Sequence, residues 1–490
     1  MMLPMGKHTG LTLYSRMISL LLFFKLGLEL LISNLTLFLF KPRTAWEQVS
    51  SELKYRFNPH ETRWWHRAGY ALAVLLHNAN YTHAAQVRIL EFFAQRIVGN
   101  LGVTNETGAK LWKSFMTDDN NPIELSWDWH TGTKRPTVRF SVEPIGLNAG
   151  TPDDPYNERA TVGFKQSILR ALPNTDMRWF DHFDAYFNEG VECNSVEGHL
   201  TRVFWAFDLG EGDIASKAYF FPGYRAQATN MTNLQVISEA IALAPSCTPE
   251  RLGAFDMFVQ FVQEHERMGR QPLELDMLAI DMMACDKSRL KIYFRSRETD
   301  FGSVRETMSL GGRVTGPDMD VGLNQLRRLW KSLFGQEGAS EDTPIGGANH
   351  RTAGILYNIE FHLGGQAPKA KIYIPVRHYA RTDAHVIKSV SNFMDSQTGL
   401  VGQSSGTARD SITAYGRDQP PAERFGPRSP SSTSYAKAFS TIFTDDAIAA
   451  SRGLHTYIGC SVQTGGALRV VSYINVQEEK LRDARLQELL

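Results

Sequence analysis

Polar and apolar residues alternate along Ser288–Phe294, as they do in a β-strand that has one apolar face. Because successive strand residues point to opposite faces, Arg289, Lys291 and Tyr293 share one side. The apolar residues of the other side are Leu290, Ile292 and Phe294. Two cations and a phenol need polar partners, so this side is predicted to border water or a bound anion. For a single strand, an ordinary solvated face explains the pattern equally well.

The pattern recurs in four further segments, at a spacing of roughly 70 to 90 residues. The residues in the corresponding places are Arg139, Lys217 with Tyr219, Lys371 with Tyr373, and Tyr457. A long and nearly regular period is typical of repeated supersecondary units. Recurrence therefore favours one shared polar face over several unrelated solvated ones.

Each of these strands has a neighbour to which a turn connects it. The predicted pairs are 123–129 with 137–142, 203–209 with 215–221, 276–283 with 288–294, 354–362 with 369–375, and 456–462 with 467–476. Gly364-Gly365 and Gly465-Gly466 are among the turn residues, and strands joined as hairpins run antiparallel. Five hairpins with polar residues on one face predict an α+β fold in which ten antiparallel strands form a barrel around a solvent-filled lumen.

Apolar residues at helical spacing fall between the hairpins and predict an outer ring of helices. The predicted helical segments are 69–77, 83–98, 163–172, 177–189, 233–244, 249–268 and 322–334. Residues 398–438 are rich in Gly, Ser and Pro, so we predict a long loop there, over one end of the barrel.

Composition argues against a nucleic-acid-binding protein and against a protein held together by zinc or disulfides. The 490 residues include 52 basic and 52 acidic side chains, so no overall positive charge indicates a nucleic-acid partner. The four cysteines show no Cys-x-x-Cys spacing, which argues against a zinc site or a disulfide framework and for a reducing, cytoplasmic compartment.

Residues 1–44 differ from the rest of the chain, which we predict to form one domain over residues 45–490. The stretch 17–40 is strongly apolar and has about the 20 residues of a membrane span, but Lys25 and Glu29 interrupt it. A membrane anchor, with membrane contact through residues 17–40, and an extension that lies beside the domain are both compatible with this pattern.

A closed barrel would bring together Arg139, Lys217, Arg289 and Lys291, with Lys371 as a fifth cation. Guanidinium groups grip phosphates with two hydrogen bonds and ammonium groups act as point charges, so the set suits a diphosphate. Aromatic faces stabilise a neighbouring cation and exclude water, which an ionising allylic diphosphate requires. Asp118-Asp119 and Asp153-Asp154 lack the third aspartate of a magnesium-binding Asp-Asp-x-x-Asp cluster, so the cations are predicted to replace a metal.

The sequence contains six notable motifs, which are Pro122–Trp127, Val138–Pro144, Ala149–Pro155, Lys217–Pro222, Arg289–Tyr293 and Tyr373–Tyr379. Together they resemble the fungal dimethylallyltryptophan synthase family of aromatic prenyltransferases. The resemblance extends over roughly residues 45–480. It implies the barrel of ααββ repeats known as the ABBA fold, and a soluble, metal-independent enzyme of secondary metabolism with no cofactor; a homodimer is compatible with it.

The resemblance also implies roles for individual residues. Glu124 matches the family's acidic residue that accepts a hydrogen bond from the aromatic acceptor, and either Glu124 or Lys217 would take the ring proton. The implied diphosphate ligands are Arg139, Lys217, Arg289, Lys291 and Lys371, and the implied tyrosine shield is Tyr219, Tyr293, Tyr373 and Tyr457. Lys371 departs from the glutamine of some members, and the last hairpin is poorer in aromatic residues than the family pattern.

These residues predict an enzyme that transfers a dimethylallyl group from dimethylallyl diphosphate to an electron-rich aromatic small molecule. Glu124 favours an indole acceptor derived from tryptophan, but a polycyclic phenol of polyketide origin could use the same carboxylate through its hydroxyl. The competing class is a non-catalytic barrel that binds a phosphorylated lipid at a membrane.

Overall fold

Ten antiparallel strands close into a barrel in the computed structural model, which describes residues 43–53, 56–104, 111–129, 136–190, 198–404 and 432–482. The order around the barrel is β1-β10-β9-β8-β7-β6-β5-β4-β3-β2, so each strand pairs with its neighbours in sequence and β1 closes on β10. The strands are β1 (Ile123–Trp129), β2 (Thr137–Val142), β3 (Val203–Leu209), β4 (Ile214–Phe220), β5 (Glu274–Asp281), β6 (Arg289–Ser296), β7 (Ile355–His362), β8 (Lys369–Ile374), β9 (His455–Val462) and β10 (Leu468–Ile474). The predicted barrel and its five hairpins are confirmed.

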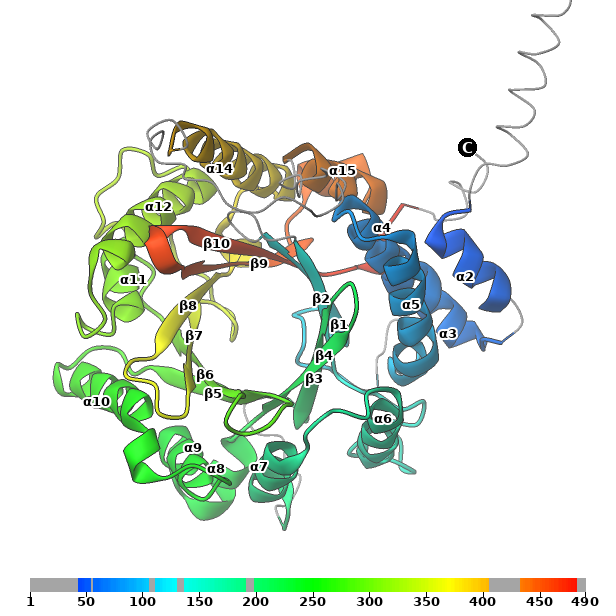
Figure 1. Cartoon of the computed structure of the whole chain (residues 1–490), viewed down its shortest axis with the longest axis horizontal. Helices are drawn as coiled ribbons and strands as arrows, with labels where there is room; N and C mark the ends of the chain where they lie inside the picture. The colour runs from blue at the N-terminus through cyan, green and yellow to red at the C-terminus, as the bar shows by residue number, and fades with distance from the viewer. Residues whose placement is uncertain are drawn as a thin grey trace, which may run out of the picture.

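Helices surround the barrel on its outer side (Figure 1). They are α2 (Ala45–Leu53), α3 (Pro59–Trp64), α4 (Tyr70–Asn78), α5 (His83–Phe92), α6 (Glu158–Ala171), α7 (Arg178–Asn188), α8 (Gly223–Thr229), α9 (Asn233–Ala242), α10 (Gly253–Arg267), α11 (Phe301–Met308), α12 (Pro317–Phe334), α13 (Val376–Tyr379), α14 (Asp383–Ser404), α15 (Ser432–Ile442) and α16 (Asp445–Ala450). The main core lies between these helices and the outward face of the strands.

Strand alternation decides which residues enter this core. In β1, Ile123, Leu125 and Trp127 are fully buried against the helices, whereas Glu124 and Ser126 line pockets inside the barrel. The other strands follow the same rule, with Phe140 of β2 and Ile292 of β6 packed outside. Since burial of each such side chain stabilises the fold by about 1.5–3 kcal/mol, a strand cannot slip by one residue without turning its apolar residues into the lumen.

The predicted loop at 398–438 is wrong at both ends. Helix α14 continues to Ser404, and α15 begins at Ser432; residues 405–431 lie outside the described part of the chain. The sequence of α15 is rich in Ser and Thr, which masks its helical spacing, but Tyr435, Phe439 and Ile442 lie on one face and are buried. Tertiary packing of that face outweighs the weak helix propensity of the remaining residues.

The apolar residues 17–40 also lie outside the described residues, as does nearly all of the predicted extension 1–44. Helix α2 begins at Ala45 and packs on the domain through Trp46, which stacks on Trp65 at 4.5 Å between ring centroids. Among the described helices, none combines the length and apolar character that crossing a membrane requires. The domain boundary and membrane contact stay predictions.

Candidate active site

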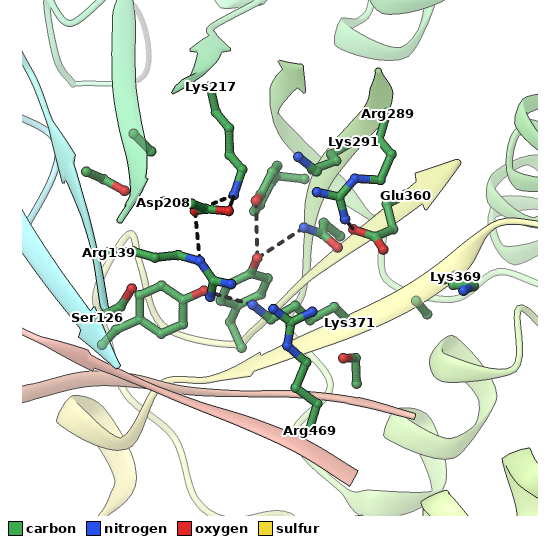
Figure 2. Close-up of a pocket in the computed structure, with 18 of the residues that line it drawn as sticks. Ser126, Arg139, Asp208, Lys217, Arg289, Lys291, Glu360, Lys369, Lys371 and Arg469 are labelled. Carbon is green, nitrogen blue, oxygen red and sulfur yellow. Dashed lines mark hydrogen bonds and ion pairs between the residues drawn. The ribbon is translucent and has the colours of Figure 1, made fainter. Parts of the chain in front are cut away.

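The described residues line two neighbouring pockets of the lumen. The first, which we call the cationic pocket, is lined by seven lysine and arginine side chains (Figure 2). They are Arg139, Lys217, Arg289, Lys291, Lys369, Lys371 and Arg469. All seven come from even-numbered strands, the second strand of each hairpin, so the barrel brings together the five cations that the alternation singled out.

Acidic residues of the odd-numbered strands hold five of these cations in place. Arg139 lies between two carboxylates, with Nη1 2.5 Å from Asp128 and Nε 2.8 Å from Asp208. Lys217 Nζ lies 2.6 Å from both carboxylate oxygens of Asp208. Because Arg139 and Asp208 face each other across β2 and β3, the strand register itself creates the ion pair.

A second group of ion pairs lies on β5, β6 and β7. Arg289 Nε is 2.7 Å from Asp281 and its Nη1 is 3.0 Å from Glu360. Lys291 forms a short ion pair with Asp281, and Arg469 of β10 pairs with Asp128. Seven cations thus face two lining carboxylates, Asp208 and Glu360, and two that pair with the cations from outside the pocket lining, Asp128 and Asp281, so the described residues leave a surplus of positive charge for an anion.

Burial and neighbouring charges together shift the pKa values of Asp208, Asp281 and Lys291. Burial raises the pKa of Asp208, but Arg139 and Lys217 outweigh it and hold that pKa well below its usual range. The pKa of Asp281 is lowered in the same way, by Lys291 and Arg289 against burial. Both side chains are therefore carboxylates at neutral pH. Burial lowers the pKa of Lys291 to about 8, although Asp281 opposes the shift.

Lys371 contacts tyrosines instead of a carboxylate. Its Nζ donates to the Tyr473 hydroxyl at 2.8 Å and lies 4.4 Å from the centre of the Tyr373 ring, and within the described ranges no carboxylate lies within 4 Å of it. Burial, with repulsion from Arg469 and Arg139, lowers the pKa of Lys371 to about 7. Gly459 of β9 provides the space, since a Cβ there would lie 3.0 Å from Lys371 Cε and from the Tyr473 ring.

A layer of tyrosines separates the cationic pocket from the second pocket. Tyr219, Tyr293, Tyr373 and Tyr473 line both pockets. Successive ring centroids, from Tyr219 to Tyr293, to Tyr373 and to Tyr473, lie 5.6, 5.6 and 5.5 Å apart. Burial raises the pKa of each of these phenols, so all four stay neutral. The predicted shield residue Tyr457 lies on the second pocket's side, 6.1 Å from Tyr373.

The second pocket, which we call the Glu124 pocket, is a mixture of apolar and charged groups. Phe115, Met116, Phe204, Met277 and Leu356 supply the apolar surface, and the charged residues are Asp118, Glu124, Asp276, Arg295 and Arg377. The Thr456 hydroxyl donates to Glu124 Oε1 at 2.5 Å. Burial raises the pKa of Glu124 to about 7, although this hydrogen bond and Arg377 oppose the shift.

The two residues predicted to move the ring proton lie in different pockets. Glu124 lines the Glu124 pocket, whereas Lys217 lines the cationic pocket with its amine bound to Asp208. The pairing carboxylates Asp128, Asp208, Asp281 and Glu360 were missed, and so was Arg377. The alternation that revealed the cations places Asp208 and Glu360 on the inward face too, so the same signal could have found these two.

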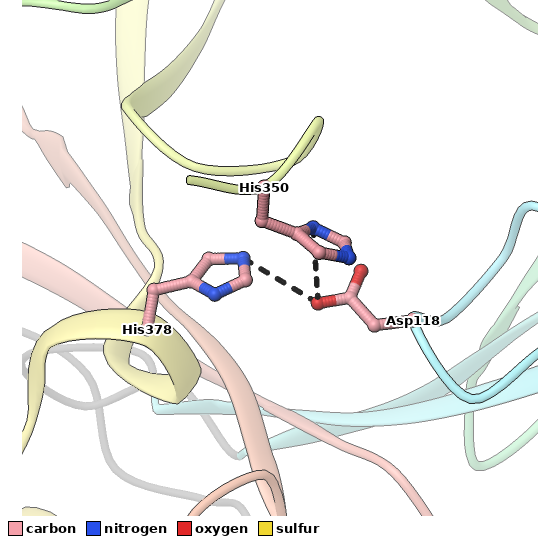
Figure 3. A group of neighbouring side chains, drawn as sticks. All are labelled: Asp118, His350 and His378. Atoms are coloured by element: carbon pink, nitrogen blue, oxygen red, sulfur yellow. Dashed lines mark ion pairs between the residues drawn. The ribbon is translucent and has the colours of Figure 1, made fainter. Parts of the chain in front are cut away.

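Asp118, His350 and His378 lie close enough to share a metal ion, since one ligand atom of each lies within 4.8 Å of the others (Figure 3). The atoms concerned already have protein partners. Arg377 Nε lies 2.7 Å from Asp118 Oδ2, and the Thr352 hydroxyl lies 2.9 Å from His378 Nε2. Burial and the charge of Arg377 lower the pKa of His378 to about 4, so it is neutral. The arrangement fits an ion-pair network centred on Asp118 better than a metal centre.

Comparison with known proteins gives the same fold and a family. AnaPT from Neosartorya fischeri superposes with a TM-score of 0.70 at 22% identity, over 89% of this chain and 99% of that one. NotF, solved in complex with brevianamide F and DMSPP, superposes with a TM-score of 0.68 at 22% identity, over 89% of this chain and 99% of that one. These similarities establish the ABBA-type barrel.

Similarity in sequence identifies the family. A 4-O-dimethylallyl-L-tyrosine synthase of Claviceps purpurea is 33% identical over 359 residues, 72% of this chain and 79% of the relative. An indole diterpene prenyltransferase of Hypoxylon pulicicidum is 30% identical over 73% of this chain and 85% of the relative. The profile of the family described as tryptophan dimethylallyltransferase matches residues 60–404. The chain therefore belongs to the tryptophan dimethylallyltransferase family and is a prenyltransferase.

Proposed function

We propose that this enzyme transfers a dimethylallyl group from dimethylallyl diphosphate to an electron-rich aromatic small molecule in secondary metabolism. The observation that carries the proposal is the division of one lumen into an anion-binding half and an aromatic-binding half, with tyrosine rings between them. Family membership supports the reaction class, and the relatives include a 7-dimethylallyltryptophan synthase of Aspergillus fumigatus.

The cationic pocket binds the diphosphate. Arg139, Arg289 and Arg469 offer paired N–H groups, and Lys217 and Lys291 add point charges. When the allylic C–O bond breaks, its electron pair leaves with the diphosphate, and these fixed charges stabilise the anion that forms. The tyrosine layer faces the allyl cation with ring surfaces and keeps water away from it.

Glu124 acts on the acceptor in the other pocket. Its carboxylate accepts the polar hydrogen of the acceptor, an indole N–H or a phenol O–H, which raises the electron density of the ring. The ring carbon then attacks the allyl cation, and the carboxylate takes the proton that the ring releases. We assign this proton to Glu124 rather than to Lys217, because Asp208 holds the Lys217 amine in the cationic pocket.

We also propose that the fixed cations make a metal ion unnecessary. Cytoplasmic localisation, a homodimer and membrane contact through residues 17–40 stay predictions from the sequence. The indole of a tryptophan derivative is the proposed acceptor. A phenol is the second candidate, because a relative 33% identical to this chain is named a 4-O-dimethylallyl-L-tyrosine synthase.

The test is to mix the enzyme with dimethylallyl diphosphate and a panel of indoles and phenols, and to measure diphosphate release together with prenylated product. We expect both to appear with at least one acceptor. Tight binding of dimethylallyl diphosphate without any product would instead support the non-catalytic lipid-binding barrel.

A further inference from the structure

Two residues that line the Glu124 pocket, Phe115 and Met116, belong to a connecting segment rather than to a strand or helix. We call residues 112–118 the strap. We propose that Glu143 is a positioning residue, which anchors the strap so that the strap keeps water out of the Glu124 pocket during the reaction. The inference rests on the proposed function and names a residue that acts through its neighbours.

Glu143 lies just beyond β2, towards the end of the barrel that holds the Glu124 pocket. On the inward face of β2, Arg139 lines the cationic pocket and Ser141 lines both pockets, and Glu143 is the next residue of that alternation. Glu143 is 3% exposed and forms no ion pair with a described residue. A buried carboxylate without a cation must be satisfied by hydrogen-bond donors.

The donors come from the strap and from the segment that leads into β3. Trp112 Nε1 donates to Glu143 Oε1 at 3.0 Å, and the Ser114 hydroxyl donates to Oε2 at 2.5 Å. The Thr201 hydroxyl donates to the same Oε2 at 3.0 Å. One carboxylate thus joins two strap side chains to a residue that lies far from them in the sequence.

The two hydroxyls extend this anchoring to the backbone of the strap. Ser114 Oγ accepts the Met116 N–H and Thr201 Oγ1 accepts the Phe115 N–H, each at 3.2 Å. A hydroxyl has a single hydrogen and a carboxylate can only accept, so Glu143 draws both hydrogens to itself and leaves the oxygen lone pairs for the strap amides. Within the described residues, these two amides donate to no backbone carbonyl, so the contacts fix this half of the strap.

The rest of the strap is held by other contacts. Asp118 fixes the far end, since Arg377 Nε lies 2.7 Å from its carboxylate. Between the two anchors, the Phe115 ring stacks on His199 at 4.2 Å and lies 4.4 Å from the guanidinium of Arg351. The strap therefore presents an ordered aromatic side chain to the pocket where the acceptor ring attacks the allyl cation.

Water that reaches the allyl cation would compete with the acceptor. Its oxygen would form a bond to the allylic carbon and release one proton, which gives dimethylallyl alcohol and diphosphate instead of the prenylated product. Exclusion of water from a closed site prevents this side reaction. A loosened strap should therefore change the partition between alcohol and product, which a purely structural role of Glu143 would leave unchanged.

The experiment compares Glu143→Gln with Asp383→Asn as a matched control. Asp383 is also a buried carboxylate that accepts several hydrogen bonds, from the backbone N–H groups of Leu454 and His455, but it lines neither pocket. Assays at about pH 8 keep Glu143 ionised, since burial raises its pKa to about 7. Alcohol, prenylated product and diphosphate are measured together, with dimethylallyl diphosphate and the acceptor that gives product in the panel.

The amide of Glu143→Gln carries hydrogens of its own, so a hydroxyl must turn and release its strap amide. An unsatisfied buried group shifts a local opening equilibrium by about 5- to 100-fold. We expect hydrogen exchange of the Phe115 and Met116 amides, followed by mass spectrometry, to become faster by this factor. The ratio of alcohol to product should rise about fivefold or more. The KM for dimethylallyl diphosphate should stay within about twofold of the parent value.

Ser114→Ala removes the contact to Met116 alone and should raise the exchange rate and the alcohol ratio by less. It decides the test if the melting temperature shows that Glu143→Gln does not fold. Asp383→Asn should lower the melting temperature but keep the alcohol ratio of the parent. An unchanged ratio in folded Glu143→Gln and Ser114→Ala, or an equal rise in Asp383→Asn, would overturn the inference. If the parent releases no diphosphate, the proposed function fails, whereas faster strap exchange in Glu143→Gln still establishes Glu143 as the anchor.

Discussion

The cationic pocket and the Glu124 pocket share one lumen but are built from different parts of the chain. In the cationic pocket, cations stand on even-numbered strands and their carboxylate partners on odd-numbered ones. In the Glu124 pocket, strand residues such as Glu124 and Tyr457 meet residues of connecting segments, among them Phe115, Asp118 and Arg377.

The two pockets differ in how strictly the fold constrains their residues. Cross-strand register holds Arg139 against Asp208, since the two residues stand opposite each other on β2 and β3. Moving one of them would disturb the apolar core on the other side of the strand. Connecting segments carry no such constraint and tolerate exchange far better. The cationic pocket is thus the more constrained half of the lumen, and the Glu124 pocket is the half that tolerates exchange of residues.

The largest effect is expected from Arg289→Ala combined with Lys291→Ala. Each charge-assisted contact to the diphosphate is worth about 1.5–3 kcal/mol, so the double variant should lose more than about 100-fold in kcat/KM. The loss should be equal for every acceptor, as measured by steady-state kinetics. Arg297→Ala is the control, since Arg297 pairs with Glu274 outside both lumen pockets. A loss that varies with the acceptor would show that the two pockets are not separate.

Glu124→Gln should cost about 10- to 100-fold in transfer while dimethylallyl diphosphate binds as before, because the lost charge-assisted hydrogen bond belongs to the acceptor. An acceptor whose polar hydrogen is replaced by a methyl group should be poor with the parent and lose little more with the variant. Kinetics of both enzymes with both acceptors measure the coupling. If the loss from acceptor methylation and the loss from Glu124→Gln simply multiply, Glu124 does not contact the polar hydrogen of the acceptor.

The pH profile should show one limb from each pocket. If Glu124 works as a carboxylate, as proposed, activity should fall about tenfold per pH unit below about 7, the value to which burial raises its pKa. The proposed binding of the donor by Lys371 needs the ammonium form, and burial lowers its pKa to about 7, so kcat/KM for the donor should decrease above neutrality. Glu124→Gln should abolish the acidic limb. Lys371→Gln should move the alkaline limb towards 8, the pKa of Lys291.

The smallest effect is expected from chelation. Because ion-paired side chains surround the place of the diphosphate, an excess of EDTA should leave the rate of product formation unchanged within about twofold. Loss of activity in EDTA that magnesium restores would show that the cationic pocket needs a metal to neutralise the leaving group.

The strand pattern alone predicted the barrel and five of the cations that line the cationic pocket. Side chains alternate with a period of two, so Lys217 with Tyr219 and Arg289 with Lys291 had to share a face once those segments formed strands. Apolar residues on the opposite face required helices to cover them. The inward carboxylates Asp208 and Glu360 follow the same alternation.

Only the tertiary structure decided what surrounds the acceptor. Asp118, Thr352 and Arg377 are far apart in the sequence, and no periodicity links the segments that carry them. Helix α15 was hidden for a related reason, because its burial against the barrel outweighs a composition that favours a loop. Local patterns determine which face a strand residue takes. Contacts between distant connecting segments depend on how the whole barrel closes. These contacts set the charge and shape of the Glu124 pocket, which local sequence patterns therefore do not predict.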